Sequence, residues 1–473
     1  MQRRGTQNIK SVPLQGNLRK VLNRRPPLNP SLCAFGRRGS CFPRRTFTEN
    51  VPGLVDHFFR REAGKMVSYL TKNFGLGGLD LAEDVVQDTL CRALETWPVH
   101  GVPDNPSAWL MRVARNRAVD LLRRDEQFRY FAPELTHLLK LREEMSPETP
   151  SFEKEIQDDQ LRMMFSCCHP ELSTEAQVTL ILKTLCGFNV AEIAHSLLTS
   201  EDSIEKRLGR ARKLFRLAGT FVEITNVSEI SKRLEAVYQA IYLLFNEGYH
   251  SSHSERTVRE DLCFEAIRLA LLLCEYPEGE KPKTHALVAL FCFHAARLSG
   301  RMDDDGSLVQ LETQDRSKWD RDLMGKGFLF LEQSSMGNEL SEYHLEAGIA
   351  SLHCSAPTYE KTEWAKILEL YDLLYRLKPS PIIALNRAVA LGKALGPEEG
   401  LAELQTIPDL AKLKDYPFYP AAQGEFHLLA GRPAEAGKHF AEAMKLARGR
   451  SETNFFERKL EACGRGATQV NHG

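Results

Sequence analysis

The sequence carries its clearest chemistry in a short helical pattern rich in Lys and Arg, between Ser200 and Ala218. Ser200 is a good N-cap for a helix that starts at Glu201. Four apolar residues then recur at helical spacing and predict one buried face, which leaves the basic residues outside: Ile204, Leu208, Ala211 and Phe215. Exposed cations of this kind neutralise DNA phosphates, and the first turns of a helix in the major groove meet the base edges.

A second, shorter helix is predicted just before it, over residues 188–197. Two short helices joined by a tight turn, the second one basic, are typical of a helix-turn-helix. The alternative is an ordinary helical pair with a solvated basic face. On the DNA-binding interpretation, two groups of residues are the candidates. Base edges would be met by Ser200, Ser203, Lys206 and Arg207, and phosphates by Arg210, Arg212 and Lys213.

The length and composition of the sequence limit the possible domain organisation and class of the protein. A chain of 473 residues exceeds one ordinary core, so two to four domains are expected. No run of residues is apolar and long enough to span a bilayer. The eleven cysteines show no paired CxxC spacing, which favours reduced thiols in a cytoplasmic protein. The net charge of −1 does not exclude DNA binding, because only the contacting face must be basic.

The first 50 residues differ from the rest of the chain. Residues 1–48 hold eleven Lys or Arg and no Asp or Glu, and they show no apolar periodicity. This composition predicts disorder. Three interpretations stay open: an upstream stretch included by a mistaken start codon, which we favour, an organellar transit peptide, or a basic arm on DNA.

Three further helices are predicted before the helix-turn-helix, over residues 54–74, 81–97 and 107–124, with a proline-rich loop at 98–106. The second helix has a stripe of apolar residues at Val85, Val86, Leu90, Ala93 and Leu94 and an acidic outer face. In the third helix, basic side chains alternate with an aromatic ring and an amide, a combination that suits binding to phosphates and bases.

The residues Asp84-Val85-Val86-Gln87-Asp88, Trp109-Leu110 and Ala114 to Asp120 resemble region 2 of a bacterial sigma factor of the extracytoplasmic-function (ECF) class. Residues 171–217 resemble region 4 of the same class, in the same order and after a similar linker. The resemblance implies an all-α protein that directs RNA polymerase core to promoter DNA. It implies neither catalysis nor a cofactor, a metal or a membrane.

The same resemblance implies roles for single residues. The acidic face would dock on the β′ clamp helices of the polymerase through Asp84, Gln87 and Asp88. The loop would hold a flipped base of the −10 element, read by Asp104 and Asn105, with help from Trp109, Arg112, Arg115 and Asn116. The candidates of the helix-turn-helix would read the −35 element. A solvated acidic face and a core role for Trp109 are the alternatives. The acids Glu201, Asp202 and Glu205 depart from many family members and could accept a hydrogen bond from cytosine.

These features predict five segments: a basic tail at 1–50, region 2 at 51–124, a linker at 125–160, region 4 at 161–219 and an extension at 220–465. Cys167, Cys168 and His169 begin region 4. Adjacent cysteines with one histidine make a poor zinc set, so a packed start is favoured, with a thiol sensor as the other hypothesis.

The extension is predicted to be helical throughout, with helix pairs after residue 380 that resemble tetratricopeptide repeats. Such arrays bind peptides or helices, so a protein partner is expected, and we hypothesise that the extension gates the two DNA-binding modules. Candidate regulatory contacts are Tyr242, Asn246 and Tyr249, and Arg316, Trp319 and Asp320. The alternative function is a helix-turn-helix regulator with a repeat-type binding domain that is not a polymerase subunit.

Overall fold

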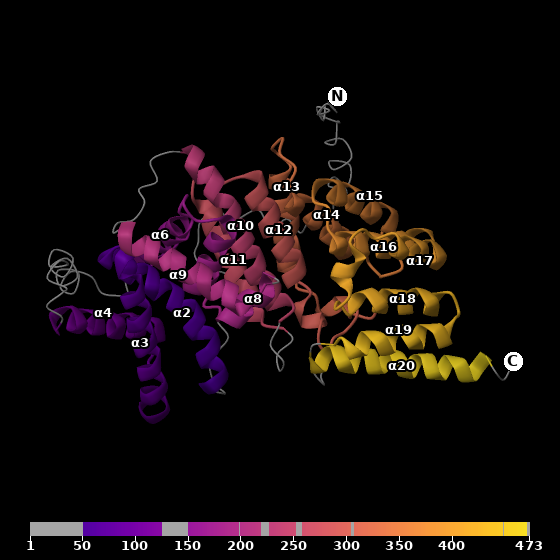
Figure 1. Cartoon of the computed structure of the whole chain (residues 1–473), viewed down its shortest axis with the longest axis horizontal. Helices are drawn as coiled ribbons and strands as arrows, with labels where there is room; N and C mark the ends of the chain where they lie inside the picture. The colour runs from indigo at the N-terminus through magenta and orange to yellow at the C-terminus, as the bar shows by residue number, and fades with distance from the viewer. Residues whose placement is uncertain are drawn as a thin grey trace. The chain divides into compact units, whose positions relative to one another are not determined.

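The structure is a computed structural model, and it describes residues 51–124, 150–197, 199–218, 227–251, 258–303, 307–447 and 449–470 (Figure 1). Within these ranges the regular elements are helices, and the extended pairing is one isolated bridge between Met302 and Leu308. The predicted all-α fold is therefore confirmed. The interpretations of residues 1–50 lie outside the described residues.

The chain divides into two compact units. The N-terminal unit contains the described residues from 51 to 251 and from 258 to 280, and the C-terminal unit contains those from 281 onward. Each unit has its own buried apolar core. The boundary between the units therefore lies inside the predicted extension, after its first two helices.

The N-terminal unit is built from nine α-helices and one short 3-10 turn among the described residues. They are α2 (Val51–Phe74), η2 (Leu76–Gly78), α3 (Leu79–His100), α4 (Pro106–Arg124), α6 (Pro150–Cys167), α7 (Thr174–Thr184), α8 (Val190–Ser196), α9 (Glu201–Ala218), α10 (Val227–Tyr249) and α11 (Glu260–Glu275). Helix α2 packs on α3, α4 and α6, while α10 packs on α6, α7 and α11. The two helices that follow α9 thus share a core with the helices before it.

The C-terminal end of α3 differs from the prediction. The sequence placed Pro98 in a loop, yet the helix continues to His100 and ends at Gly101, whose φ of 84° suits a glycine after a helix. Pro98 lies inside the helix, where its missing N–H removes one backbone hydrogen bond to the preceding turn. Leu94, assigned to the buried stripe, is 46% exposed, whereas Trp97 is buried in its place. The connection before α4 is therefore residues 101–105.

The C-terminal unit is a succession of helices that pack on their neighbours along the chain. They are α12 (Pro282–Ala295), η4 (Leu298–Gly300), η5 (Arg316–Lys318), α13 (Arg321–Ser334), α14 (Glu342–Ser355), α15 (Trp364–Leu377), α16 (Pro381–Leu395), α17 (Pro397–Gln405), η6 (Leu410–Leu413), α18 (Phe418–Leu429), α19 (Pro433–Lys445) and α20 (Arg450–Val470). From α15 to α20, helices lie side by side with their partners in sequence (Figure 1). The predicted helix pairs are present, and α20 is an element that the sequence analysis missed.

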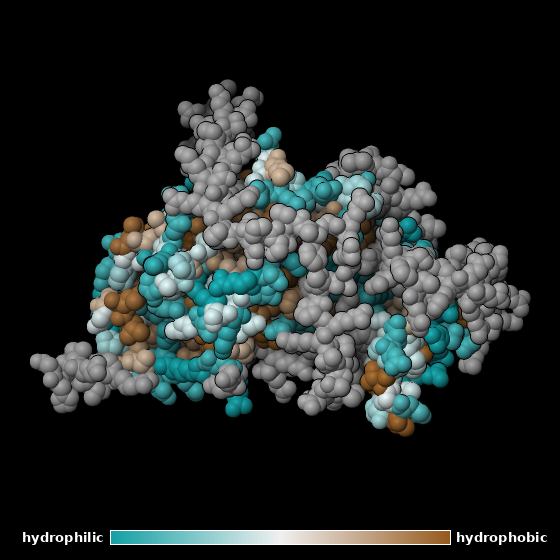
Figure 2. All heavy atoms as spheres, turned by 180° about the vertical axis from the view of Figure 1, so that it is seen from behind, coloured by the Kyte–Doolittle hydropathy of each residue, from teal (hydrophilic) through white to brown (hydrophobic). Residues whose placement is uncertain are grey.

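Most of the coloured surface in Figure 2 is hydrophilic, with small separate apolar patches. Among the described residues, the most exposed large apolar side chains are Leu217, Met336 and Val99. In that same part of the chain, helices with the length and apolarity needed to cross a membrane are not found.

Two glycines set the distance between α16 and α17. A Cβ atom on Gly392 would lie 2.3 Å from Cζ of Phe426, and one on Gly400 would lie 2.6 Å from the same atom. Phe426 is 1% exposed and belongs to the core cluster formed with Leu385, Leu404 and neighbouring residues. The ring therefore fills the space that the missing side chains leave.

We predict that Gly392→Ala destabilises the C-terminal unit by about 1–3 kcal/mol, because the added methyl group must displace a buried ring. Urea unfolding followed by circular dichroism measures the change. Gly437→Ala is the matched control: it also lies inside a helix, its Cβ would meet nothing closer than 3.9 Å, and it should be neutral or stabilising. Equal stability of the two variants would contradict the packing argument.

Candidate nucleic-acid and polymerase interface

Helix α9 has the cap and the buried face that its sequence predicts. The backbone N–H of Ser203 donates to Oγ of Ser200 at 3.3 Å, which confirms Ser200 as the N-cap. The four apolar residues of the predicted stripe are buried, with exposed fractions between 0% and 4%. The opposite face of the helix is therefore free to carry polar side chains.

The preceding helix α8 is held by a capping box. The backbone N–H of Glu192 donates to Oδ1 of Asn189, and the carboxylate of Glu192 accepts from the N–H of Asn189, each at 2.8 Å. Gly187, with a φ of 67°, makes the turn between α7 and α8. Helices α8 and α9 pack on each other and on α7, as a helix-turn-helix requires.

The basic candidates on α9 fall into two groups. Lys206, Arg210 and Lys213 are exposed, whereas Arg207 and Arg212 are half-buried. Arg212 faces the acidic start of α3: its Nη2 lies 2.7 Å from Oε2 of Glu83, and its Nε lies 3.1 Å from Oδ1 of Asp80. In this arrangement Arg212 is therefore occupied by carboxylates of region 2. The acids Glu201, Asp202 and Glu205 are exposed beside the cations.

The predicted polymerase face of α3 is exposed at all three of its residues, Asp84, Gln87 and Asp88. Asp88 is also paired within the molecule, because Nε and Nη2 of Arg117 on α4 donate to its Oδ2 at 2.9 and 2.8 Å. The structure brings the three side chains together on one helix, but their contact with polymerase stays a prediction.

The candidates for the −10 element lie around the start of α4. Asp104 and Asn105 are exposed, and Oδ1 of Asn105 accepts from the N–H of Ala108 at 3.0 Å, so this amide also caps the helix. Trp109 is half-buried, with its ring edge-on to Trp97 at 5.6 Å between centroids. These positions suit both a structural role and a nucleic-acid contact.

The remaining −10 candidates differ in accessibility. Arg112 and Asn116 are exposed, but Arg115 is only 8% exposed. A buried guanidinium offers little surface to DNA, so Arg112 and Asn116 are better placed than Arg115 in this arrangement. The assignment of all three stays a prediction.

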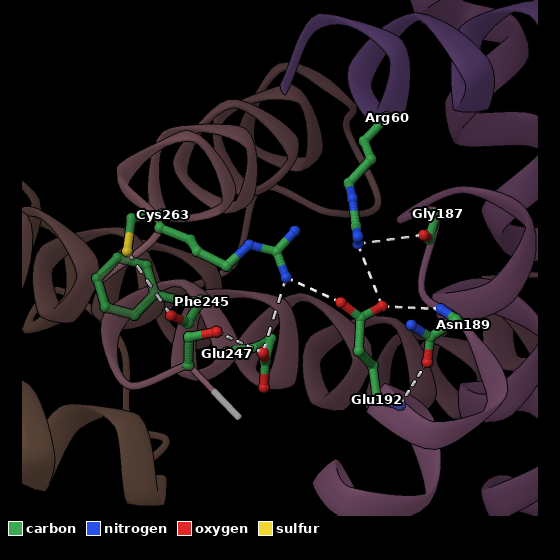
Figure 3. Close-up of polar contacts among 9 residues, drawn as sticks. Arg60, Gly187, Asn189, Glu192, Phe245, Glu247 and Cys263 are labelled. Atoms are coloured by element: carbon green, nitrogen blue, oxygen red, sulfur yellow. Dashed lines mark hydrogen bonds and ion pairs between the residues drawn. The ribbon is translucent and has the colours of Figure 1, made fainter. Parts of the chain in front are cut away.

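A buried group of charges, the Glu192 cluster, joins four helices of the N-terminal unit (Figure 3). We define it as Arg60 of α2, Glu192 of α8, Glu247 of α10 and Arg259, which precedes α11. Nη1 of Arg60 donates to Oε2 of Glu192 at 3.2 Å and to the carbonyl of Gly187 at 3.3 Å. Nη1 of Arg259 donates to Oε1 of Glu192 at 2.8 Å and lies 3.8 Å from Oε1 of Glu247.

The side chains of this cluster are mostly shielded from water, so each charge depends on its partners in the protein. The side chains of Arg259, Glu192 and Glu247 are 4%, 9% and 2% exposed, and that of Arg60 is 20% exposed. Burial alone would raise the pKa of Glu192, but the nearby Arg60, with the donors of Asn189 and Arg259, outweighs it and holds the pKa below its usual value. The sequence gives no sign of this cluster, because its members are up to 199 positions apart and share no periodicity.

The two sets of regulatory candidates lie in different units. On α10, Tyr242 and Tyr249 are half-buried and Asn246 is exposed, and the ring of Tyr249 stacks on Phe245 at 5.8 Å between centroids. In the C-terminal unit, Oδ1 of Asp320 caps α13 by accepting from the N–H groups of Asp322 and Leu323, each at 2.9 Å.

Arg316 and Trp319 meet each other within the C-terminal unit, and the regulatory role assigned to them stays a prediction. The guanidinium lies 4.5 Å from the centre of the buried Trp319 ring. Its Nη1 donates to the carbonyl of His353, in the last turn of α14, at 2.7 Å and to that of Ala356, just after it, at 2.6 Å. The motif around residue 316 therefore ties the loop before α13 to the end of α14.

Cys167 and Cys168 are completely buried at the end of α6, and His169 is half-buried after it. Burial raises the pKa of Cys167 well above its usual value and that of Cys168 to about 12, so both thiols are protonated at neutral pH. Protonated, buried thiols pack as apolar groups and are poor metal ligands. Across the described residues, groups of three or more side chains arranged to hold a metal ion are not found.

Comparison with known proteins identifies the two DNA-binding modules. Residues 58–128 match the family model of sigma-70 region 2, residues 162–215 match that of sigma-70 region 4, and residues 233–335 match a family of unknown function, DUF6596. No solved structure matches the chain.

Relatives agree with these models. An uncharacterized protein of Rhizobium meliloti is 36% identical over 385 residues, which cover 81% of this chain and 90% of the relative. The RNA polymerase sigma factor CnrH of Cupriavidus metallidurans is 30% identical, over 32% of this chain and 78% of the relative. The ECF RNA polymerase sigma factor SigL of Mycobacterium tuberculosis is 31% identical, over 29% and 73%.

The chain therefore belongs to the sigma-70 family of RNA polymerase sigma factors, in its ECF group, and carries a helical extension after region 4. The alternative, a regulator that is not a polymerase subunit, is not favoured by these matches.

Two half-buried histidines of the C-terminal unit, His294 and His353, predict how this unit responds to acid. Burial, with Arg297 nearby, lowers the pKa of both His294 and His353 to about 3. The unfolded chain takes up these protons near pH 6.5, so the stability that neutral imidazoles provide is lost as the pH falls from 6.5 toward 3. The expected slope is about 1.4 kcal/mol per pH unit for each histidine.

Urea unfolding at several pH values measures this slope. The double variant His294→Gln/His353→Gln should unfold with a much weaker pH dependence than the wild type in this range. The same slope in both proteins would contradict the role of the two histidines.

Proposed function

We propose that this sigma factor binds RNA polymerase core through the acidic face of α3 and reads the −35 element with α9, under the control of its extension. The observation that supports the first part is the exposure of Asp84, Gln87 and Asp88 on one helix of region 2. Carboxylates spaced in this way suit a basic coiled coil such as the β′ clamp helices. As a polymerase subunit the protein acts in the bacterial cytoplasm and without catalytic chemistry of its own.

For the promoter, the exposed Lys206, Arg210 and Lys213 on α9 supply charge for phosphates. Ser203 and the acids of the first turn are placed to meet base edges, since the N-terminal end of such a helix enters the groove. The residues from Asp104 to Asn116 carry the corresponding contact with the −10 element.

The Glu192 cluster supports control by the extension. Arg259, which follows region 4, pairs with a carboxylate of the helix-turn-helix, and Arg60 of region 2 pairs with the same carboxylate. A change in α10 or α11 therefore alters the charges that position α8. The helix pairs of the C-terminal unit offer a surface for the protein partner that triggers such a change.

We expect Asp84→Lys to weaken binding to core polymerase at least about tenfold, because reversing an exposed charge at a charged interface costs more than 1.4 kcal/mol. Fluorescence anisotropy of labelled protein titrated with core polymerase measures the affinity. The control Glu339→Lys makes the same charge change at an exposed position of the C-terminal unit. Equal affinities of both variants and the wild type would refute the assignment of α3.

Removing the C-terminal unit tests control by the extension. The chain should end at Glu280 rather than at the end of α9, because α10 and α11 pack on α6 and α7 and complete the core of the N-terminal unit. We expect run-off transcription from the same start site to change at least about threefold, which corresponds to about 0.65 kcal/mol. Circular dichroism verifies that the shortened chain is folded. Unchanged transcription by a folded shortened chain would exclude gating by the removed unit.

A further inference from the structure

The basic end of α9 lies on the acidic start of α3. Arg212 reaches both Glu83 and Asp80, at 2.7 and 3.1 Å, and Nη2 of Arg216 lies 3.2 Å from Oδ2 of Asp80. Gly77, in the turn before α3, lies against the same helix, since a Cβ atom on it would be 3.9 Å from Cα of Arg216. Two cations of region 4 thus pair with two carboxylates of region 2.

A groove of about 490 Å³ runs beside these ion pairs. Asp84 and Gln87 of α3 line one side, and Leu208 and Gly209 of α9 line the other. Two of the three side chains assigned to polymerase, Asp84 and Gln87, therefore face region 4 across this groove. A coiled coil that docks on these two residues must enter the groove, of which α9 forms the opposite side.

From this geometry we propose that α9, which lies beside the exposed polymerase-binding face, obstructs a coiled coil that docks there, and that its contact with α3 is an autoinhibitory latch. We define the latch as the ion pairs of Arg212 and Arg216 with Asp80 and Glu83. The proposal rests on the assignment of Asp84 and Gln87 to the polymerase interface. In the latched state the same contact obstructs the docking of polymerase on Asp84 and Gln87 and withholds Arg212 from DNA phosphates.

The exposure of the latch makes it reversible. The side chains of Arg212 and Arg216 are 30% and 65% exposed, and that of Asp80 is 42% exposed. Ion pairs this open to water are typically weak and are screened by salt. A basic surface of polymerase can therefore replace the arginines on α3, while promoter phosphates replace the carboxylates around Arg212.

The test opens the latch at residues that are outside the assigned polymerase and DNA contacts. Arg216→Glu places a negative charge opposite Asp80, and Asp80→Lys acts from the other side. Spin labels on the exposed Cys91 of α3 and on a cysteine introduced at the exposed Leu217 of α9 report the distance by double electron–electron resonance. Three further cysteines are first replaced by serine: Cys274, which is half-buried, and Cys33 and Cys41, which lie outside the described residues.

We expect a longer and broader distance distribution in both variants than in the wild type. In the absence of DNA, Arg216→Glu should bind core polymerase about fivefold more tightly, the effect of opening one ion pair of this kind. Lys445→Glu, the same charge change at an exposed residue of α19, should change neither measurement.

Two results would overturn the latch: an unchanged label distance in both variants, or equal binding of core polymerase by Arg216→Glu and the wild type. If the wild type and every variant fail to bind core polymerase, the assignment of α3 to the polymerase interface is wrong. The latch proposal, which rests on that assignment, is then wrong as well. Measurable but equal binding of core polymerase by the wild type and Arg216→Glu therefore excludes the latch and leaves the assignment of α3 intact.

Discussion

The N-terminal unit depends on one buried carboxylate, that of Glu192. Its Oε2 atom accepts from Arg60 and from the backbone of Asn189, and its Oε1 atom accepts from Arg259. A carboxylate that is 9% exposed is tolerated only when such partners compensate for its lost hydration. The same side chain therefore caps α8 locally and joins region 2, region 4 and the start of the extension.

The two roles of Glu192, as a cap of α8 and as the partner of Arg259, explain why the extension begins inside the N-terminal unit. Helices α10 and α11 cover α6 and α7 and deliver Arg259 to Glu192. Gly248 permits the close approach, because a Cβ atom there would lie 2.7 Å from the backbone nitrogen of Cys263. The helix-turn-helix of this protein is therefore supported on one side by region 2 and on the other by residues that follow it in the chain.

Local features were predictable from the sequence. The buried face of α9, its Ser200 cap and most helices of the extension follow from periodicity and from capping residues, which act over a few positions. Long-range pairs were not predictable in this way. Arg212 resembles an outward phosphate contact until the fold places Glu83, 129 positions earlier, beside it. Arg115 likewise belongs to a basic helix by sequence, and only tertiary packing reduces its exposure to 8%.

The C-terminal end of α3 differs from the sequence prediction in another way. Pro98 is a strong loop signal, but the residue that ends the helix is Gly101, which adopts a positive φ that other residues rarely reach. Extending the helix by one turn shortens the following connection to residues 101–105 and carries Val99 to the surface beside it. The loop assigned to the −10 element is accordingly shorter than the sequence indicates.

The unequal burial of the two arginines around Glu192 distinguishes its contact with region 2 from its contact with the start of the extension. Arg60 is 20% exposed and Arg259 is 4% exposed, so water can replace Arg60 more readily than Arg259. Removing a buried partner leaves an uncompensated charge and costs several kcal/mol, whereas a partly exposed partner is lost at smaller cost. On the latch proposal we therefore expect Glu192 to keep Arg259 and to release Arg60 when α9 leaves α3. Helices α8 and α9 pack on α7, and α10 packs on α7 as well, so the helix-turn-helix and the start of the extension share one supporting helix. Helix α7 is therefore the packing connection between them.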